Sequence, residues 1–191
     1  MQRCNMTRGL LAAALVCGSA STALATTVVQ LSDADMARQS ELIVTGRCAG
    51  LRSEWVGRDL VTVATIEVGE SLKGDAAATI QVALPGGIDA DRRFPIAVTW
   101  PGAPRIAAGE EVFLFLVDDA GLDRPVIAGF AQGKFTIVAD ENGQKVATQD
   151  LGGLTLVDEG RGRAVGRARA IPLSDLEQRV RETLGRDAGR R

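Results

Sequence analysis

Histidine and tyrosine are absent from the 191-residue chain, and these two absences exclude more chemistry than any other feature of its composition. Without histidine there is no Ser-His-Asp or Cys-His catalytic set and no imidazole base, and few ways remain to build a zinc site. Aromatic residues are also scarce, with five phenylalanines and two tryptophans. We therefore expect no catalytic residues, no cofactor and no bound metal, and we give weight to any aromatic residue in a loop.

The first 25 residues have the three parts of a secretory signal peptide. Arg3 and Arg8 supply positive charge, and residues 10–16 are all leucine, alanine or valine, a run too short to span a bilayer. Ala23 and Ala25 are small residues at the two positions that signal peptidase reads. We expect cleavage after Ala25 and export of a bacterial protein to the periplasm or the medium, with no membrane span in the remaining chain.

Cysteine is nearly lost on processing, because only Cys48 lies beyond the predicted cleavage site. One thiol cannot form an internal disulfide, so a hydrophobic core must hold the fold alone. Cys48 shares strand parity with Leu42 and Val44, which predicts a buried thiol, the alternative being an exposed or intermolecular one. Lipid attachment at Cys17 fits less well than cleavage at alanine, because Val16 stands where a small residue is needed.

Strong charge of one sign is absent too. Residues 26–191 hold 20 basic and 24 acidic side chains, a net charge of −4. A net charge this small argues against a nucleic-acid partner and against general binding to membrane surfaces.

What is present is mainly β patterning with a helix near each end. Ser32 and Asp35 have capping-box spacing and predict a helix that ends near Ser40. The unbroken apolar run 112–117 predicts a central strand covered on both faces. Alternation and turn residues predict the other strands at 42–48, 59–68, 79–84, 125–130, 134–139 and 145–149, with a short one within 94–100. The second strand is expected to stop before Gly69, and residues 140–143 to form a hairpin turn.

The C-terminal part has a different character. Residues 161–169 hold four arginines and little that could pack, which predicts a flexible connector; attraction to an acidic surface, a lipid headgroup or cell-wall phosphate is the alternative. Beyond it, Ser174 and Glu177 predict a capped amphipathic helix over residues 175–184. We thus divide the chain into a signal peptide (1–25), a β-barrel-like domain (26–157), an Arg/Gly-rich connector (158–172) and a C-terminal helix with its tail (173–191). The fold class is mainly β, a small OB-like barrel or a sandwich.

Four phrases occur in a recognisable order: ESLKG at 70–74, LPGG at 84–87, GAP at 102–104 and GEEVFLFL at 109–116. Together they resemble an uncharacterised family of signal-bearing bacterial proteins. The plan is similar to the OB-type barrel of netrin-like modules, the class that includes tissue inhibitors of metalloproteases. The resemblance covers residues 42–139 and implies a barrel that binds a partner. Those inhibitors start with a cysteine that binds the enzyme's zinc, whereas Thr26 is the expected first residue here.

The stretch 88–109 is the longest without a clear period, and loops of this length in compact domains are often functional. Within it, Phe94 and Trp100 combine with Arg92 and Arg93, and aromatic and arginine side chains are good interface anchors. We predict a protein-binding loop formed by these four residues. The alternative is that Phe94 and Trp100 fold back as a lid on the barrel.

Paired acidic residues at 89/91, 110/111 and 118/119 lie in predicted turns, where solvated carboxylates are usual, and the turn at 140–143 lacks the later ligands of a calcium loop. The resulting functional expectation is an exported, non-enzymatic domain that binds another protein. An inhibitor or chaperone of an exported protease is the second hypothesis, and an enzyme that uses carboxylates alone is the third.

Overall fold

Strands dominate the structure, a computed structural model that describes residues 26–158 and 160–189. The predicted signal peptide lies outside the described residues. The elements follow in this order: β1 (Thr26–Val29), α1 (Asp33–Gln39), β2 (Leu42–Val56), β3 (Asp59–Lys73), β4 (Thr79–Pro85), β5 (Gly87–Asp89), β6 (Ile96–Val98), β7 (Glu111–Asp119), β8 (Arg124–Ile127), β9 (Lys134–Ala139), β10 (Lys145–Gln149), β11 (Leu154–Asp158), β12 (Gly162–Val165), β13 (Arg169–Pro172) and α2 (Leu173–Ala188).

Five strands close into a barrel. They pair in the order β7-β2-β3-β4-β8, and β8 returns to pair with β7. Every pairing is antiparallel except that of β4 with β8, which is parallel and consists of Ala83 opposite Val126. In chain order β4 is the third and β8 the fifth strand of this ring, and their pairing gives the strand order of an OB barrel. The predicted mainly β, OB-like fold is confirmed, and closure of the ring favours a barrel over a sandwich.

The hairpin of β2 and β3 forms most of the barrel wall. Its strands have 15 residues each and are joined by Gly57 and Arg58, with Gly57 at a φ of +61°. The prediction that the second strand stops before Gly69 was wrong, because β3 runs on to Lys73. Register shifts, two of them opposite this end of β3, bend the ladder and keep residues 70–73 paired with β2.

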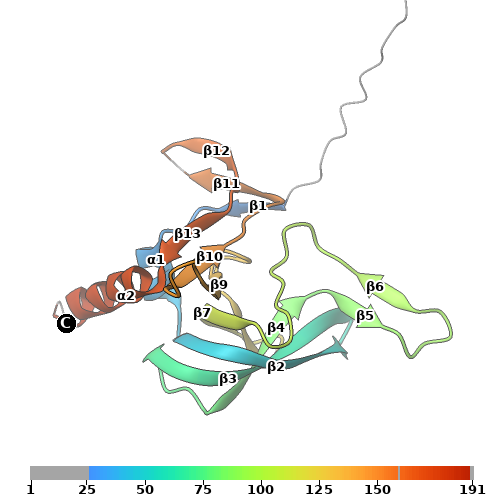
Figure 1. Cartoon of the computed structure of the whole chain (residues 1–191). Coiled ribbons are helices and arrows are strands. Elements are labelled where there is room, and N and C mark those ends of the chain that lie inside the picture. Colours follow the sequence, from blue (N-terminus) through green and yellow to red (C-terminus); the bar gives the residue numbers. More distant parts are fainter. Residues whose placement is uncertain (1–25, 159, 190–191) are drawn as a thin grey trace, which may run out of the picture.

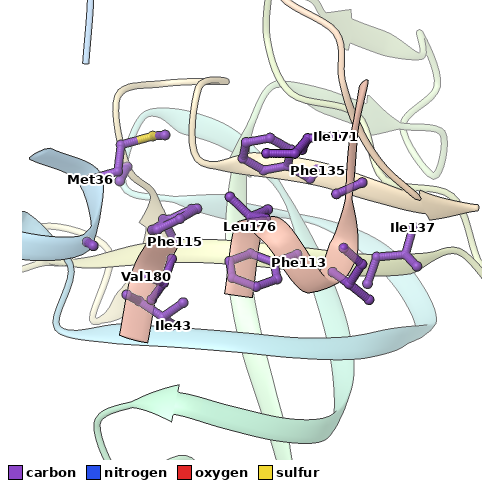
Figure 2. Packing of buried hydrophobic residues seen from close by; sticks show 13 residues of the cluster. Met36, Ile43, Phe113, Phe115, Phe135, Ile137, Ile171, Leu176 and Val180 are labelled. Atoms are coloured by element: carbon purple, nitrogen blue, oxygen red, sulfur yellow. The ribbon is translucent and has the colours of Figure 1, made fainter. Parts of the chain in front are cut away.

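Strand β7 has a hydrophobic core on each side, as its unbroken apolar run predicts. Leu114 and its even-numbered neighbours lie inside the barrel, in a cluster that also holds Cys48, so the buried thiol is confirmed. On the other face, the ring centroids of Phe113 and Phe115 lie 6.3 and 6.1 Å from that of Phe135 and 5.2 Å from each other. Figure 2 shows these rings beside the side chains of α1 and α2.

Helix α1 is capped as predicted. The Asp35 backbone N–H donates to the Ser32 hydroxyl (3.1 Å), and the Ser32 N–H donates to the Asp35 carboxylate (3.3 Å). Ser40 ends the helix, and Met36 is fully buried in the core shared with α2.

Helix α2 differs from its predicted form. It begins at Leu173 rather than Asp175, continues to Ala188, and has Pro172 at the N-cap with no side-chain hydrogen bond. The predicted cap by Ser174 and Glu177 was therefore wrong. Strand β13 leads straight into the helix, and burial of Leu173 in the core places the start there without a polar cap.

The predicted flexible connector was also wrong for much of its length. Residues 162–165 form β12, which pairs with β11, and residues 169–172 form β13, which pairs with β10. Backbone pairing orders this arginine-rich stretch although its side chains are mostly exposed. Strands β9, β10 and β13 extend the sheet from β7 and carry α2 on the same core as Phe113.

Two regions complete the molecule. Strand β11, which the sequence did not predict, lies between β1, in parallel, and β12 in a separate small sheet. Strands β5 and β6 form a hairpin within the predicted long loop, so the short strand expected in 94–100 is confirmed as β6. In Figure 1 this hairpin and the β11–β12 hairpin project from different sides of the barrel. No helix within the described ranges is long and apolar enough to cross a membrane.

Candidate functional site

The four predicted binding residues all lie in the excursion between β4 and β7, but they do not converge on one point. Arg92, Arg93 and Phe94 occupy the tip between β5 and β6, whereas Trp100 follows β6 near the barrel. Phe94 is 76% exposed and Trp100 53% exposed. The lid interpretation does not fit Phe94, because a lid would bury the ring against the barrel.

The base of the hairpin is fixed by the outer end of β2. The Ile88 backbone N–H donates to the Ser53 hydroxyl (3.0 Å), and the Trp55 indole N–H donates to the Asp89 carboxylate (2.6 Å). Arg92 also donates to Asp89 (2.7 Å) and lies over the Trp55 ring, 5.1 Å from its centroid. Two strands and a loop are thus held together through one carboxylate.

The carboxylate at the centre of these contacts stays charged. The hydrogen bond from the Trp55 indole is the main reason that the pKa of Asp89 lies below its ordinary value, with a further contribution from Arg92. The negative charge of Asp89 holds the Arg92 guanidinium, whereas Arg93, the other arginine of the tip, makes a different contact. The Arg93 guanidinium lies over the Phe94 ring at 5.6 Å, so the tip presents a cation and an aromatic ring together.

The LPGG phrase has a local structural reason. A Cβ atom on Gly86 would lie 2.5 Å from the Val98 carbonyl oxygen, and one on Gly87 would lie 2.8 Å from the Ser53 hydroxyl. Gly86 also has a φ of +86°, which glycine adopts without strain. The two glycines let the chain leave β4 and turn β5 back against β2, which places Asp89 beside Trp55.

Trp100 stands where three hollows meet. The largest, about 650 Å³, is bordered by Leu60, Val61, Val98 and Val126 and is mostly apolar. A second hollow of about 380 Å³ is more polar, with Arg105 and Asp150 in its lining, and a third of about 350 Å³ lies against the β5–β6 hairpin. Trp100 contributes to the wall of each. This arrangement suits insertion of a partner's side chains on either side of the indole.

We call the exposed residues of this region the hairpin–Trp100 surface: Trp55, Ile88, Arg92, Arg93, Phe94 and Trp100. Sequence reasoning missed Trp55 and its neighbour Ser53, because they lie on a regular strand more than 30 residues before the loop. The available signal was a tryptophan near a hairpin turn, a position where burial is not expected.

The acidic pairs are occupied by structural contacts. Glu110 accepts hydrogen bonds from Lys134 (2.6 Å) and Thr136 (2.5 Å), and Asp119 accepts one from the Gly121 backbone N–H (2.8 Å). Burial acts to raise the pKa of Glu110, but the hydrogen bonds from Lys134 and Thr136 outweigh it and lower the pKa below its ordinary value. Asp89 is engaged as described above. Of the six residues in these pairs, only Asp119 lines one of the three hollows described above.

Metal and thiol chemistry find little support among the residues described. Asp140 accepts the backbone N–H groups of Asn142 and Gln144 (2.8 Å each), which makes the predicted hairpin turn, and Gly143 takes a φ of +78°. No cluster of three or more histidine, cysteine or acidic side chains within 26–158 and 160–189 could hold a metal ion. Burial raises the pKa of the Cys48 thiol, and Glu110 adds to the shift.

The chain was compared with protein-family models, with curated proteins and with solved structures, and nothing matches it in any of the three.

Proposed function

We propose that this chain is an exported, non-enzymatic domain that binds another protein in the periplasm or outside the cell. The contact is made by the hairpin–Trp100 surface. One observation carries the proposal: Phe94 and Trp100, large aromatic side chains in a chain that has few, are left mostly in water on one excursion from the barrel. Exposed apolar groups gathered in one region mark interaction sites more often than scattered ones do.

The composition of the surface supports a protein partner. Tryptophan and arginine are the residues that most often dominate binding energy at protein interfaces, and the surface has two of each. The hollows beside Trp100 provide places for apolar side chains of the partner. Local charge is balanced, because Asp89 and Asp91 offset Arg92 and Arg93, so attraction by net charge is not the driving force.

Pre-organisation favours binding by this surface. The hydrogen bonds of Ser53 and Asp89 fix the base of the hairpin before any partner arrives. A loop held in place in the free protein loses less conformational entropy on binding than a mobile one does. The same property gives the second hypothesis its support, because a stiff projecting hairpin is also what an inhibitor of an exported protease needs.

Site-specific photo-crosslinking in the exporting bacterium tests the proposal. A photoreactive amino acid at position 94 or 100 is expected to capture a discrete protein, and the same group at Val138, exposed on β9, is the matched control. Equal capture at position 138 would contradict the assignment of the surface.

Alanine substitution then measures the contribution of each ring. Phe94→Ala and Trp100→Ala are each expected to weaken binding of the captured protein by about 30-fold or more, as interface anchors of this type do. Their thermal midpoints should stay near that of the parent protein. If Trp100→Ala unfolds the domain instead, the indole is a structural lid. If the captured protein is a protease, its activity with and without the purified domain separates inhibition from plain binding.

A further inference from the structure

Although the net charge of the chain is small, basic and acidic side chains are unevenly distributed along the sequence. Residues 161–191 hold nine arginines and four carboxylates, so this part is basic although the whole protein is acidic. Three of the arginines flank or belong to β12, which projects from a different side of the barrel than the β5–β6 hairpin in Figure 1. A basic region can therefore act locally where the net charge of the chain would not predict it.

The small sheet of β1, β11 and β12 has one covered and one open face. Val28, Leu154 and Leu156 point inward and pack in a hydrophobic cluster with Phe130. Residues that alternate with them form two rows on the opposite face. These rows are Thr27–Thr155–Val165 and Val29–Val157–Arg163, which we call the valine–arginine face.

This face is open to solvent. Val29 is 64% exposed and Val165 74% exposed, and every residue of β12 is exposed. Its side chains are β-branched apart from Arg163, and it includes no aromatic ring. It is flanked by Arg161 and Arg167, both exposed, at the two ends of β12.

The arginines of this stretch divide into two kinds. Arg169 is used inside the fold, where it pairs with Asp33, donates to Gln149 (2.6 Å) and lies 5.1 Å from the centroid of Phe135. Among the described residues, no carboxylate oxygen lies within 4.0 Å of the side-chain nitrogens of the other three, Arg161, Arg163 and Arg167.

Asp158, the described carboxylate closest to them along the chain, turns one oxygen to backbone N–H groups. That oxygen accepts from Gly160 (2.8 Å) and from the backbone of Arg161 (3.1 Å). Its hydrogen bonds go to the backbone of the β11–β12 turn, so within 26–158 and 160–189 no carboxylate competes with an external anion for the three guanidinium groups.

We infer that the valine–arginine face docks on a membrane surface rich in anionic phospholipid. Three guanidinium groups beside exposed valines match a layer of phosphate headgroups above acyl chains, because arginine pairs with phosphate and small apolar groups enter the headgroup boundary. A protein partner is less well matched, since the face has no aromatic anchor and none of its residues lines any of the three hollows described above. The face also begins at Thr27, the second residue after the predicted cleavage site.

Vesicle co-sedimentation of the exported protein, its N-terminal residue established by mass spectrometry, tests this inference. The protein should bind vesicles of phosphatidylglycerol and phosphatidylcholine, bind pure phosphatidylcholine weakly, and lose binding as salt rises. Replacing Arg161, Arg163 and Arg167 together by serine should weaken binding about 100-fold. Val29→Thr with Val165→Thr, which keeps β-branching, should weaken it about tenfold.

The matched control replaces three exposed arginines elsewhere, Arg47, Arg58 and Arg105, by serine and removes the same charge. It should leave vesicle binding within about twofold of the parent, since it leaves the face intact. Equal losses in the two triple variants would overturn the inference, as would equal binding to both kinds of vesicle. Complete displacement by soluble glycerol phosphate would indicate a site for free phosphate instead. A dimer that Val165→Thr abolishes would assign the face to a second copy of the chain, and either result would also overturn it.

Discussion

Replacement of Leu176 by alanine tests whether the C-terminal helix belongs to the same cooperative unit as the barrel. Leu176 is fully buried in the core that joins α1, α2 and β7, where it lies near Phe113 and Val180 (Figure 2). Leucine-to-alanine changes at sites of this kind destabilise proteins by about 3–5 kcal/mol, because the transfer free energy of the lost atoms adds to that of a cavity. For a domain of this size the melting temperature should fall by about 6–20 °C.

The assay is urea unfolding followed by two probes. Tryptophan fluorescence reports on the barrel end of the molecule, because Trp55 and Trp100 are the only tryptophans, and far-ultraviolet circular dichroism includes the helices. We expect both curves of Leu176→Ala to move together to lower urea, since β7 belongs to both cores. The control Gln178→Ala lies on the exposed side of the same helix and should change stability by less than about 0.5 kcal/mol. A fluorescence curve that stays in place while the helical signal shifts would refute this reasoning and restore a separate C-terminal unit.

Two further predictions concern single contacts. The pKa of Glu110 is lowered in the folded protein, so the stability that its carboxylate contributes is present above the ordinary glutamate pKa and is lost as pH falls through the folded pKa. Glu110→Gln should therefore lose less stability than the parent protein as the pH is lowered in acid unfolding. Parallel curves of stability against pH would contradict this. A Cβ atom on Gly46 would lie 2.4 Å from the Glu67 carbonyl oxygen and 2.8 Å from Ile66 Cγ2, so Gly46→Ala should destabilise the barrel by about 1–3 kcal/mol in urea unfolding, whereas Gly50→Ala, with open space at its Cβ position, should cost much less.

Local signals in the sequence predicted local structure well. The capping box of α1, the turn at residues 140–143 and the two covered faces of β7 each depend on residues close together in the chain, and each is confirmed. The predictions of secondary structure failed where pairing with a strand outside the segment determines the structure. Residues 162–165 have no packing pattern of their own and become a strand because β11 supplies hydrogen-bond partners. Helix α2 begins earlier than predicted for a similar reason. The pairing of β13 and the burial of Leu173 determine where the helix starts, and the capping pattern at Ser174 does not.

The candidate surface was predicted in part. Composition drew attention to Phe94 and Trp100, and both are exposed. Their supporting contacts were beyond the reach of sequence reasoning, because the Trp55–Asp89 hydrogen bond joins positions 34 residues apart. The alternation of apolar and polar residues along β2 gives no sign that the β5–β6 hairpin lies against the end of that strand.

The distribution of aromatic residues links the fold to its proposed role. Three of the seven aromatic side chains, Phe113, Phe115 and Phe135, are fully buried in one core, while the barrel interior is filled by aliphatic residues. Both tryptophans and Phe94 lie instead on a single exposed surface. Burial of such a ring would stabilise the domain by about 2–3 kcal/mol, so a chain selected for stability alone would place them inside. The pattern fits the proposed role, in which the exposed tryptophans contribute to binding a partner rather than to the core.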